Sequence, residues 1–444
     1  MNAVVVAILV MVTLSLARVS VVFSLIIAAL VGGPLAGMPL EEILAAFNDG
    51  LGQGAGIALS YAALGAFAVA LARSGITDRL AGFILQRLHD QAKISNQWLS
   101  SLLLGALLLM AISSQNLIPV HIAFIPILVP PLLAVMNRLN LDRRAVACVI
   151  TFGITAPYML LPVGFGAIFL NDILLTNLNT AGAAEGVVFS AERIPQAMLL
   201  PILGMALGLI VAVFFSYRKK RHYASLPIGD QQPVRETPLK PWQWLIILAS
   251  ILTALGVQLG FNSMVLGGLA GFALLSLSGV FRWREQDDIF TEGMRMMALV
   301  GFIMITASGF AGVMQATGAI PELVETSVEV IGDNKGMAAL IMLLVGLFIT
   351  LGIGSSFSTI PIIAALYVPL ALSFGFSPLA TIALVGTAAA LGDAGSPASD
   401  STLGPTSGLN ADGQHDHIWD SVVPTFVHYN LPLIAFGWLA AMLL

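Results

Sequence analysis

The sequence predicts an all-α integral membrane protein made of two inverted repeats, each with five membrane spans, one re-entrant hairpin and a helix broken at the midplane. The first reason is composition: 58% of the 444 residues are hydrophobic and 10% are charged, whereas soluble domains carry about 25% charged residues. The second reason is that apolar stretches long enough to cross a hydrocarbon core of about 30 Å recur from end to end. The third is that two such stretches are interrupted by a polar cluster followed by proline, near Ser113 and again near Ser355.

Ten spans and two hairpins follow when hydropathy is combined with chain-breaking residues. The first half is predicted to hold spans at 2–17, 19–37, 57–72, 145–169 and 194–216 and a hairpin at 98–136. The second half is predicted to hold spans at 243–258, 261–280, 297–313, 379–405 and 421–443 and a hairpin at 336–374. The chain then divides into a first repeat at 1–216, a linker at 217–241 and a second repeat at 242–444.

The two repeats are expected to have opposite orientations. Five crossings per half is an odd number, so the second copy must lie upside down relative to the first. Landmarks keep a nearly constant offset: Gly50 and Gly293 are 243 positions apart, and Pro157 and Pro397 are 240 apart. In such folds, substrate and ion sites lie at the repeat interface near the midplane.

Basic residues predict the orientation in the membrane, because cytoplasmic loops carry an excess of Lys and Arg. If the run Arg218–Arg221 is cytoplasmic, 17 of the 19 Lys and Arg lie on that side. We therefore expect a multi-pass protein of a bacterial-type cell (inner) membrane with both termini outside the cytoplasm. Cys148 is the single cysteine, so no disulfide within the chain is possible.

Two acidic residues fall inside the predicted span at 379–405. A carboxylate at the bilayer centre costs roughly 2.5–3.5 kcal/mol, so Asp393 and Asp400 must face protein, water or an ion. Gly392 and Gly395 disfavour a continuous helix and free carbonyl oxygens, which join carboxylates and hydroxyls as hard ligands for Na+. The alternative is that the serines only satisfy the broken backbone and one Asp caps a half-helix. The candidate cation or proton ligands are Asp393, Asp400, Ser396, Ser399, Ser401 and Thr402, with Asp393 and Asp400 as the direct ligands of Na+.

The matching segment of the first half, Thr151–Gly166, keeps glycines and prolines but has no acid. Thr155 and the carbonyls near Ala156 are candidates to bind a cation or a neutral group. A proline kink without any ligand explains the same residues equally well.

The two hairpin tips are the candidate substrate site, because their hydroxyls and amides should approach each other near the midplane. The alternative is that small polar residues only let the hairpin arms pack closely. His121 follows the first tip and either accepts a proton, contacts substrate or is a structural histidine. The candidate residues are Ser113, Ser114, Gln115 and Asn116 at the first tip, Ser355, Ser356, Ser358 and Thr359 at the second, and Thr155 and His121.

The acidic and histidine-containing stretch Asp412–Asp420 is predicted to be a hydrogen-bonded loop that closes the end of the broken span. A metal cluster is disfavoured because adjacent positions rarely converge on one ion. Tyr429 and Asn430, in the last span, are placed to face the same site.

At these residues the chain resembles the Na+/H+ antiporter family of the ion-transporter superfamily. The resemblance rests on Ser396–Asp400, on the loop Asn410–Asp420 and on the hairpin breaks. It implies a scaffold domain that forms a homodimer, a transport domain that moves like an elevator, and coupling to Na+ or H+. Similar members are assigned to amino acids such as histidine. Gln115 and Phe357 depart from the dicarboxylate branch of the superfamily.

The sequence therefore supports two transport hypotheses. In the first, a secondary active Na+/H+ antiporter with alternating access, Na+ and H+ compete for Asp393 or Asp400. In the second, Na+ or H+ drives uptake of a small organic solute such as an amino acid. An enzyme is disfavoured because no nucleophile and base pair is recognisable, and no cofactor beyond the coupling ion is expected. The expected partners are membrane lipid and a small ion or small-molecule substrate, without nucleic acid.

Overall fold

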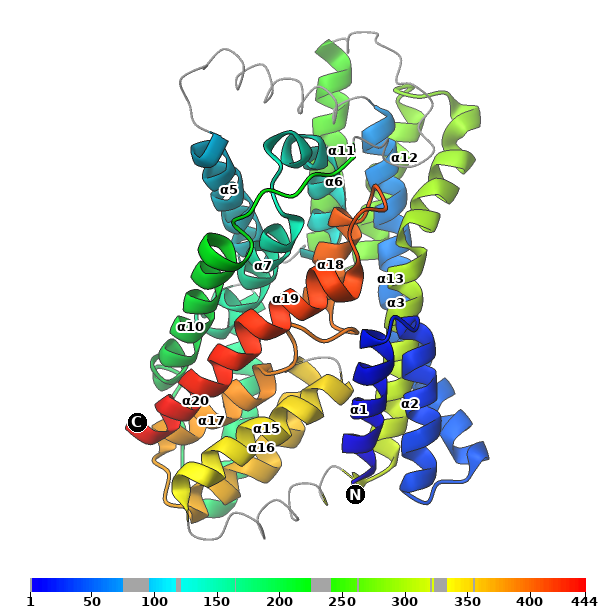
Figure 1. The fold of residues 1–444 in the computed structure, drawn as a ribbon. Coiled ribbons are helices and arrows are strands. Elements are labelled where there is room, and N and C mark those ends of the chain that lie inside the picture. Colours follow the sequence, from blue (N-terminus) through cyan, green and yellow to red (C-terminus); the bar gives the residue numbers. More distant parts are fainter. Residues whose placement is uncertain are drawn as a thin grey trace.

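A computed structural model of the chain describes residues 2–74, 96–116, 121–163, 165–224, 241–261, 263–319, 322, 334–353 and 356–444. Regular structure in these ranges is helical throughout (Figure 1). Six of the described helical segments are long and apolar enough to cross a membrane. They are Leu40–Leu71, Trp98–Gln115, Arg193–Ser216, Met297–Ala316, Lys335–Ile353 and His417–Leu443.

The helices of the first half follow the predicted order. They are α1 (Ala3–Leu16), α2 (Val21–Leu35), α3 (Leu40–Arg73), α5 (Asn96–Asn116), α6 (His121–Leu139), α7 (Arg143–Thr155), the 3-10 turn η1 (Pro157–Met159), α8 (Phe165–Ala167), η2 (Ile168–Leu175), α9 (Thr176–Gly182), η3 (Ala183–Glu185), α10 (Arg193–Val211) and η4 (Ala212–Ser216).

The helices of the second half come next in the chain. They are α11 (Pro241–Phe261), α12 (Met264–Leu277), η5 (Trp283–Glu285), α13 (Gln286–Ala316), α15 (Lys335–Ile353), α16 (Ser356–Ser373), α17 (Pro378–Ala390), α18 (Asp400–Leu409), η6 (His417–Val422), α19 (Val423–Thr425), η7 (Phe426–Asn430) and α20 (Leu431–Leu443).

Helices α3 and α13 lie side by side over their length (Figure 1). A Cβ atom at Gly50 would stand 2.5 Å from the carbonyl oxygen of Ser308. A Cβ atom at Gly65 would stand 2.5 Å from the carbonyl oxygen of Gly293. Residue numbers therefore rise along α3 where they fall along α13, so the two helices run antiparallel. Glycine at these contacts lets the backbones approach closely, as small residues do between membrane helices.

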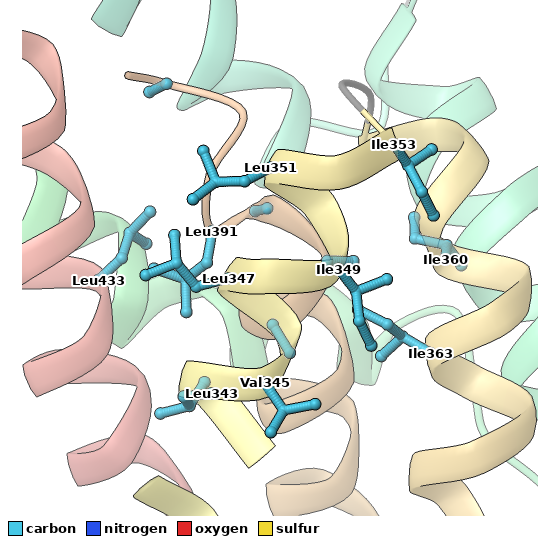
Figure 2. Packing of buried hydrophobic residues seen from close by; sticks show 14 of the residues in the cluster. Leu343, Val345, Leu347, Ile349, Leu351, Ile353, Ile360, Ile363, Leu391 and Leu433 are labelled. Atoms are coloured by element: carbon cyan, nitrogen blue, oxygen red, sulfur yellow. The ribbon is translucent and has the colours of Figure 1, made fainter. Parts of the chain in front are cut away.

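The second hairpin is formed by α15 and α16, and the two sides of α15 pack in different directions (Figure 2). Leu347 and Leu351 point toward Leu391 and Leu433, whereas Ile349 and Ile353 face α16. The residues on each side are four positions apart, which is the spacing that places side chains on one helix face. Each face thus belongs to one continuous apolar core.

Both predicted broken spans are interrupted. In the first half α7 ends at Thr155 and is followed by Pro157, which cannot donate a helical hydrogen bond. In the second half α17 ends at Ala390, and helix resumes only at Asp400. Gly392 and Gly395 in this gap have φ of 85° and 97°, a conformation that favours glycine. A Cβ at Gly395 would also stand 2.5 Å from Cα of Phe426, so the turn admits no larger residue without a backbone shift.

Helices α3 and α13 are longer than the spans predicted at 57–72 and 297–313. Helix α3 has 34 residues, which at about 1.5 Å per residue gives a length of about 51 Å. The added turns carry Glu41 and Glu42 at the start of α3 and Asp287 and Asp288 at the start of α13. The predicted spans are limited to apolar stretches and so exclude these acidic residues. The helices nevertheless include them, because negative side chains are stabilising in the first turn of a helix.

We expect Gly54→Ala to destabilise the protein, because a Cβ there would stand 2.5 Å from the carbonyl oxygen of Met304. Overpacking of this kind costs about 1–3 kcal/mol. Gly52→Ala and Gly56→Ala on the same helix are matched controls, since a Cβ at either meets no atom within 4 Å. Thermal unfolding in detergent should show a lower midpoint for Gly54→Ala alone. Equal midpoints for all three variants would contradict the glycine contact.

Candidate functional site

The carboxylate of Asp393 is surrounded by four hydroxyl groups. Oδ2 accepts hydrogen bonds from Tyr158 at 2.8 Å and from Ser356 at 2.7 Å. Oδ1 accepts from the Ser399 hydroxyl and, at 3.3 Å, from that of Ser401. The single proton of Ser401 is shared with the backbone oxygen of Asp393, which lies closer, at 2.7 Å. Hydrogen bonds to a carboxylate are charge-assisted and stronger than those between neutral groups, so this arrangement stabilises the negative charge.

The four hydroxyls come from three parts of the chain. Tyr158 lies in η1, immediately after the break of α7, and its ring packs edge-on against Phe169 at a centroid distance of 4.7 Å. Ser356 is the first residue of α16, at the second hairpin tip. Ser399 is the N-cap of α18, whose first turn holds Ser401. The fold thus brings both broken segments and one hairpin tip to a single carboxylate.

Side chains from neighbouring helices hold the backbone of the gap between α17 and α18. Asn430 accepts from the backbone N–H of Gly392 at 2.7 Å and donates to the carbonyl oxygen of Ala394. Thr402 donates to the carbonyl oxygen of Ser396 at 2.6 Å. Backbone groups inside a membrane need protein partners, and these side chains supply them.

Helix α7 contacts α18 through Thr151. Thr151 donates to the carbonyl oxygen of Ser401 at 2.8 Å. One turn later, Thr155 donates to the carbonyl oxygen of Thr151 at 2.6 Å, so its hydroxyl is bonded to its own helix. The Thr155 oxygen keeps lone pairs for a cation.

Asp400 differs from Asp393, because its Oδ1 is buried and has no hydrogen-bond partner in the described part of the chain. Asp400 is the first residue of α18, where the helix dipole favours a negative charge. The carboxylate also interacts electrostatically with Asp393, a charge of the same sign. An unpaired buried charge is costly, so a proton or a cation at Asp400 relieves the cost.

Only part of the first hairpin tip lies within the described residues. Ser113 is half-buried, and Ser114 donates to the carbonyl oxygen of Ala111 in its own helix at 2.8 Å. Gln115 is buried, and its Oε1 has no partner within the described ranges. At the second tip Thr359 is buried and has an interaction partner. Four further predicted site residues lie outside what the structure describes: Ser355, and the side chains of Asn116, His121 and Ser358.

Ser396 belongs to the loop rather than to the shell of Asp393. Its hydroxyl accepts from the backbone N–H of Ala398 at 3.2 Å. Next to it, the carbonyl oxygen of Pro397 accepts a hydrogen bond from Nε2 of His417 at 2.8 Å, so Nε2 carries a proton. These contacts shape the turn that brings Ser399 to Asp393.

The stretch Asp412–Asp420 is hydrogen-bonded, as predicted, but it is a loop only over residues 412–416, and from His417 onward it belongs to η6. The Asp412 carboxylate bonds Arg143 through both oxygens, at 2.6 and 2.5 Å. Burial raises the pKa of Asp412, but the Arg143 contacts outweigh it, aided by Gln414, and hold the pKa below its usual value. His415 is buried with Nε2 at 2.8 Å from the Ser421 hydroxyl, and burial lowers its pKa to about 3.

Tyr158 and Arg143 are the residues that sequence reasoning missed. A tyrosine directly after a proline that ends a helix is a signal for Tyr158, because the break turns that side chain toward the gap. Arg143 gave no such signal, since its partners Leu409 and Asp412 are more than 260 positions away in the chain. Asn430 was predicted to face the site and does.

The site and the fold define a class: a helical membrane protein that places a carboxylate and hydroxyls between broken helices, as secondary transporters do. A model of the Na+/H+ antiporter family matches residues 149–438, and a second model of an Na+-H+ antiporter family matches residues 2–88. The chain belongs to the Na+/H+ antiporter family and is a membrane transporter, not an enzyme.

Three relatives match over the full chain. An uncharacterized membrane protein of Vibrio parahaemolyticus is 59% identical, and each sequence is covered completely. An uncharacterized membrane protein of Haemophilus influenzae is 54% identical, with 100% of this chain and 99% of the relative covered. YuiF of Bacillus subtilis, provisionally named an amino acid transporter, is 50% identical over both full lengths.

Two solved structures of transporters match more distantly. MtrF of Neisseria gonorrhoeae, from a class described as antimetabolite efflux pumps, is 16% identical with a TM-score of 0.43, and 91% of this chain and 85% of that chain are covered. The YdaH transporter of Alcanivorax borkumensis is 15% identical with a TM-score of 0.44, and 91% and 88% are covered.

The lowered pKa of His415 makes stability depend on pH. An unfolded histidine binds a proton below about pH 6.5, whereas the folded His415 binds one only near pH 3. Between these values the unfolded state binds more protons, so the free energy of unfolding falls as the pH is lowered. From this residue alone the loss from pH 7 to pH 5 is about 2 kcal/mol.

Chemical denaturation in detergent at pH 5 and pH 7 measures this slope. His415→Gln keeps an N–H for Ser421 and should show a shallower slope than the parent. His222→Gln is the control, because His222 is exposed. An unchanged slope in His415→Gln would show that His415 is not the group that titrates.

Proposed function

We propose that this transporter is a secondary active Na+/H+ antiporter in which Na+ and H+ compete for Asp393 and Asp400. The observation that carries the proposal is the shell of Asp393, where four hydroxyl oxygens from three chain segments surround one carboxylate. The family match supports exchange of these two ions.

The donor set suits a small hard cation. Hydroxyl groups rotate, so Ser356, Ser399 and Ser401 can donate to Asp393 in the absence of a cation and present lone pairs to one when it binds. The switch needs no rearrangement of the backbone. The local dielectric is low, so the attraction between Na+ and the carboxylate is much stronger than in water.

Asp400 supplies the competition. Its buried Oδ1 has no hydrogen-bond partner in the described ranges, and the like charge of Asp393 is nearby, so this carboxylate gains from either a proton or a cation. A proton on Asp400 weakens the field that attracts Na+, and a Na+ near Asp393 favours release of that proton. Two carboxylates in one site therefore couple the two ions.

Alternating access is the mechanism we propose, with inverted repeats as its basis. Adding 243 to positions 50 and 65 gives 293 and 308, so the contact of Gly50 with Ser308 is the repeat image of the contact of Gly65 with Gly293. An antiparallel contact that maps onto itself in this way is expected where two inverted copies meet on a pseudo-twofold axis. Elevator-type movement, a homodimer, and both termini outside the cytoplasm of an inner membrane belong to the same proposal.

The test uses purified protein in liposomes with an internal pH dye. A Na+ gradient should move protons in the parent without any organic solute. Asp393→Asn and Asp400→Asn should each abolish this movement, because an amide neither binds H+ nor carries charge for Na+. Asp287→Asn, an exposed acid at the start of α13, is the control that should retain it. Full activity in both site variants would remove the carboxylates from the mechanism.

A second candidate is uptake of an amino acid driven by Na+ or H+. The buried Oε1 of Gln115 at the first hairpin tip, which has no hydrogen-bond partner among the described residues, supports it, since such an oxygen can accept from an amino group. The name given to the Bacillus subtilis relative points the same way.

Two variants separate the candidates. Ser114→Ala and Asn116→Ala should weaken the apparent affinity for a labelled amino acid such as histidine if uptake is the function. Under antiport they should leave Na+-driven proton movement nearly unchanged. Liposomes that move protons without solute, and accumulate no labelled amino acid, would exclude the uptake candidate.

A further inference from the structure

The charged side chain of Arg143 is fully buried in the molecule, 8 positions along α7 from Thr151. It donates to both oxygens of Asp412, to the carbonyl oxygen of Leu409 at 2.9 Å and to Oδ1 of Asn137 at 2.9 Å. A guanidinium that serves three partners in a fixed planar geometry fixes their relative positions, which a flexible ammonium does not.

These partners belong to different elements. Asn137 is near the end of α6, Leu409 is the last residue of α18, and Asp412 lies in the loop that follows α18. The segment 217–224 covers the same place: the Tyr223 hydroxyl accepts from the backbone N–H of Arg143 at 3.1 Å, and its ring lies 4.3 Å from the guanidinium carbon. Arg143 therefore joins α6, α7, α18 and the start of the linker.

Helices α7 and α18 run antiparallel between this point and the candidate site. Arg143 meets Leu409 at one end, and Thr151 meets Ser401 at the other. Beyond Thr151 the chain of α7 continues into η1, where Tyr158 bonds Asp393. A shift of α7 along α18 would move Tyr158 relative to Asp393. The contacts of Arg143 oppose such a shift from the far end.

We propose that Arg143 is a positioning residue for the cation site: its fork to Asp412 and Leu409 sets the register of α7 against α18 and thereby the placement of Tyr158 and Ser401 around Asp393. This inference rests on the proposed function of that site. It assigns an effect on cation affinity, in addition to any effect on stability, to a buried ion pair whose arginine lies 15 positions before Tyr158 in the chain.

Two variants of Arg143 test it. Arg143→Lys keeps the charge and loses the fork. The double variant Arg143→Met with Asp412→Leu removes both charges, so that neither is left buried and unpaired, and is the one expected to fold. Arg221→Lys is the matched control, because Arg221 is partly exposed and pairs at 2.6 Å with Asp420, which lies in η6 and not in α18.

Two readouts are taken for each protein: the Na+ concentration at half-maximal proton movement in liposomes, and the Na+ concentration that half-maximally raises the unfolding temperature in detergent. In enzymes a misplacement of about 1 Å can lower the rate up to about 100-fold. We expect a loss of cation affinity of similar size, so both midpoints should rise roughly 10- to 100-fold in the Arg143 variants. Arg221→Lys should keep the parental midpoints.

The outcomes distinguish the two proposals. Parental Na+ midpoints in a double variant that is folded would overturn the positioning role while leaving the cation site intact. If the parent itself shows neither Na+-driven proton movement nor stabilisation by Na+, the proposed function fails, and the positioning role for a cation site fails with it. A raised midpoint together with an unchanged unfolding temperature in the absence of Na+ would separate positioning from mere stabilisation.

Discussion

The structure depends on one constraint: a helix broken inside hydrocarbon must find partners for its free peptide groups within the protein. The gap between α17 and α18 meets this constraint with side chains from three other places. Asn430 bonds Gly392 and Ala394, Thr402 bonds Ser396, and His417 bonds Pro397. These hydrogen bonds stabilise a polar turn inside an apolar protein, and Asp393 is part of that turn.

The same constraint explains the unequal roles of the two acids. Asp393 is placed where hydroxyls from other segments converge, so its charge is compensated. Asp400 begins a helix and keeps one buried oxygen without a partner in the described ranges. The hydroxyl shell therefore compensates the charge of one carboxylate, whereas the other carboxylate keeps an oxygen for a proton or a cation. The exchange of two ions that we propose uses both kinds of group.

The glycine contacts of α3 and α13 and the ion pair of Arg143 with Asp412 act at a distance from this site. Gly50 and Gly65 allow the two long helices to touch along their backbones, which gives the molecule a closely packed pair of helices beside the polar turn. Arg143 joins the opposite ends of α7 and α18. Close packing on one side and a buried ion pair on the other leave the polar turn with a defined geometry.

The membrane class, the order of the helices and the two breaks could be predicted from the sequence, because hydropathy, glycine and proline act locally. The sequence also predicted that Asp393, Ser399 and Ser401 belong to one site, since they are neighbours in one broken span. Helix packing, in contrast, brings Tyr158 and Ser356 to Asp393 and leaves Oδ1 of Asp400 without a partner among the described residues. Partners 37 to 269 positions apart meet only through helix packing, which leaves no local pattern in the sequence.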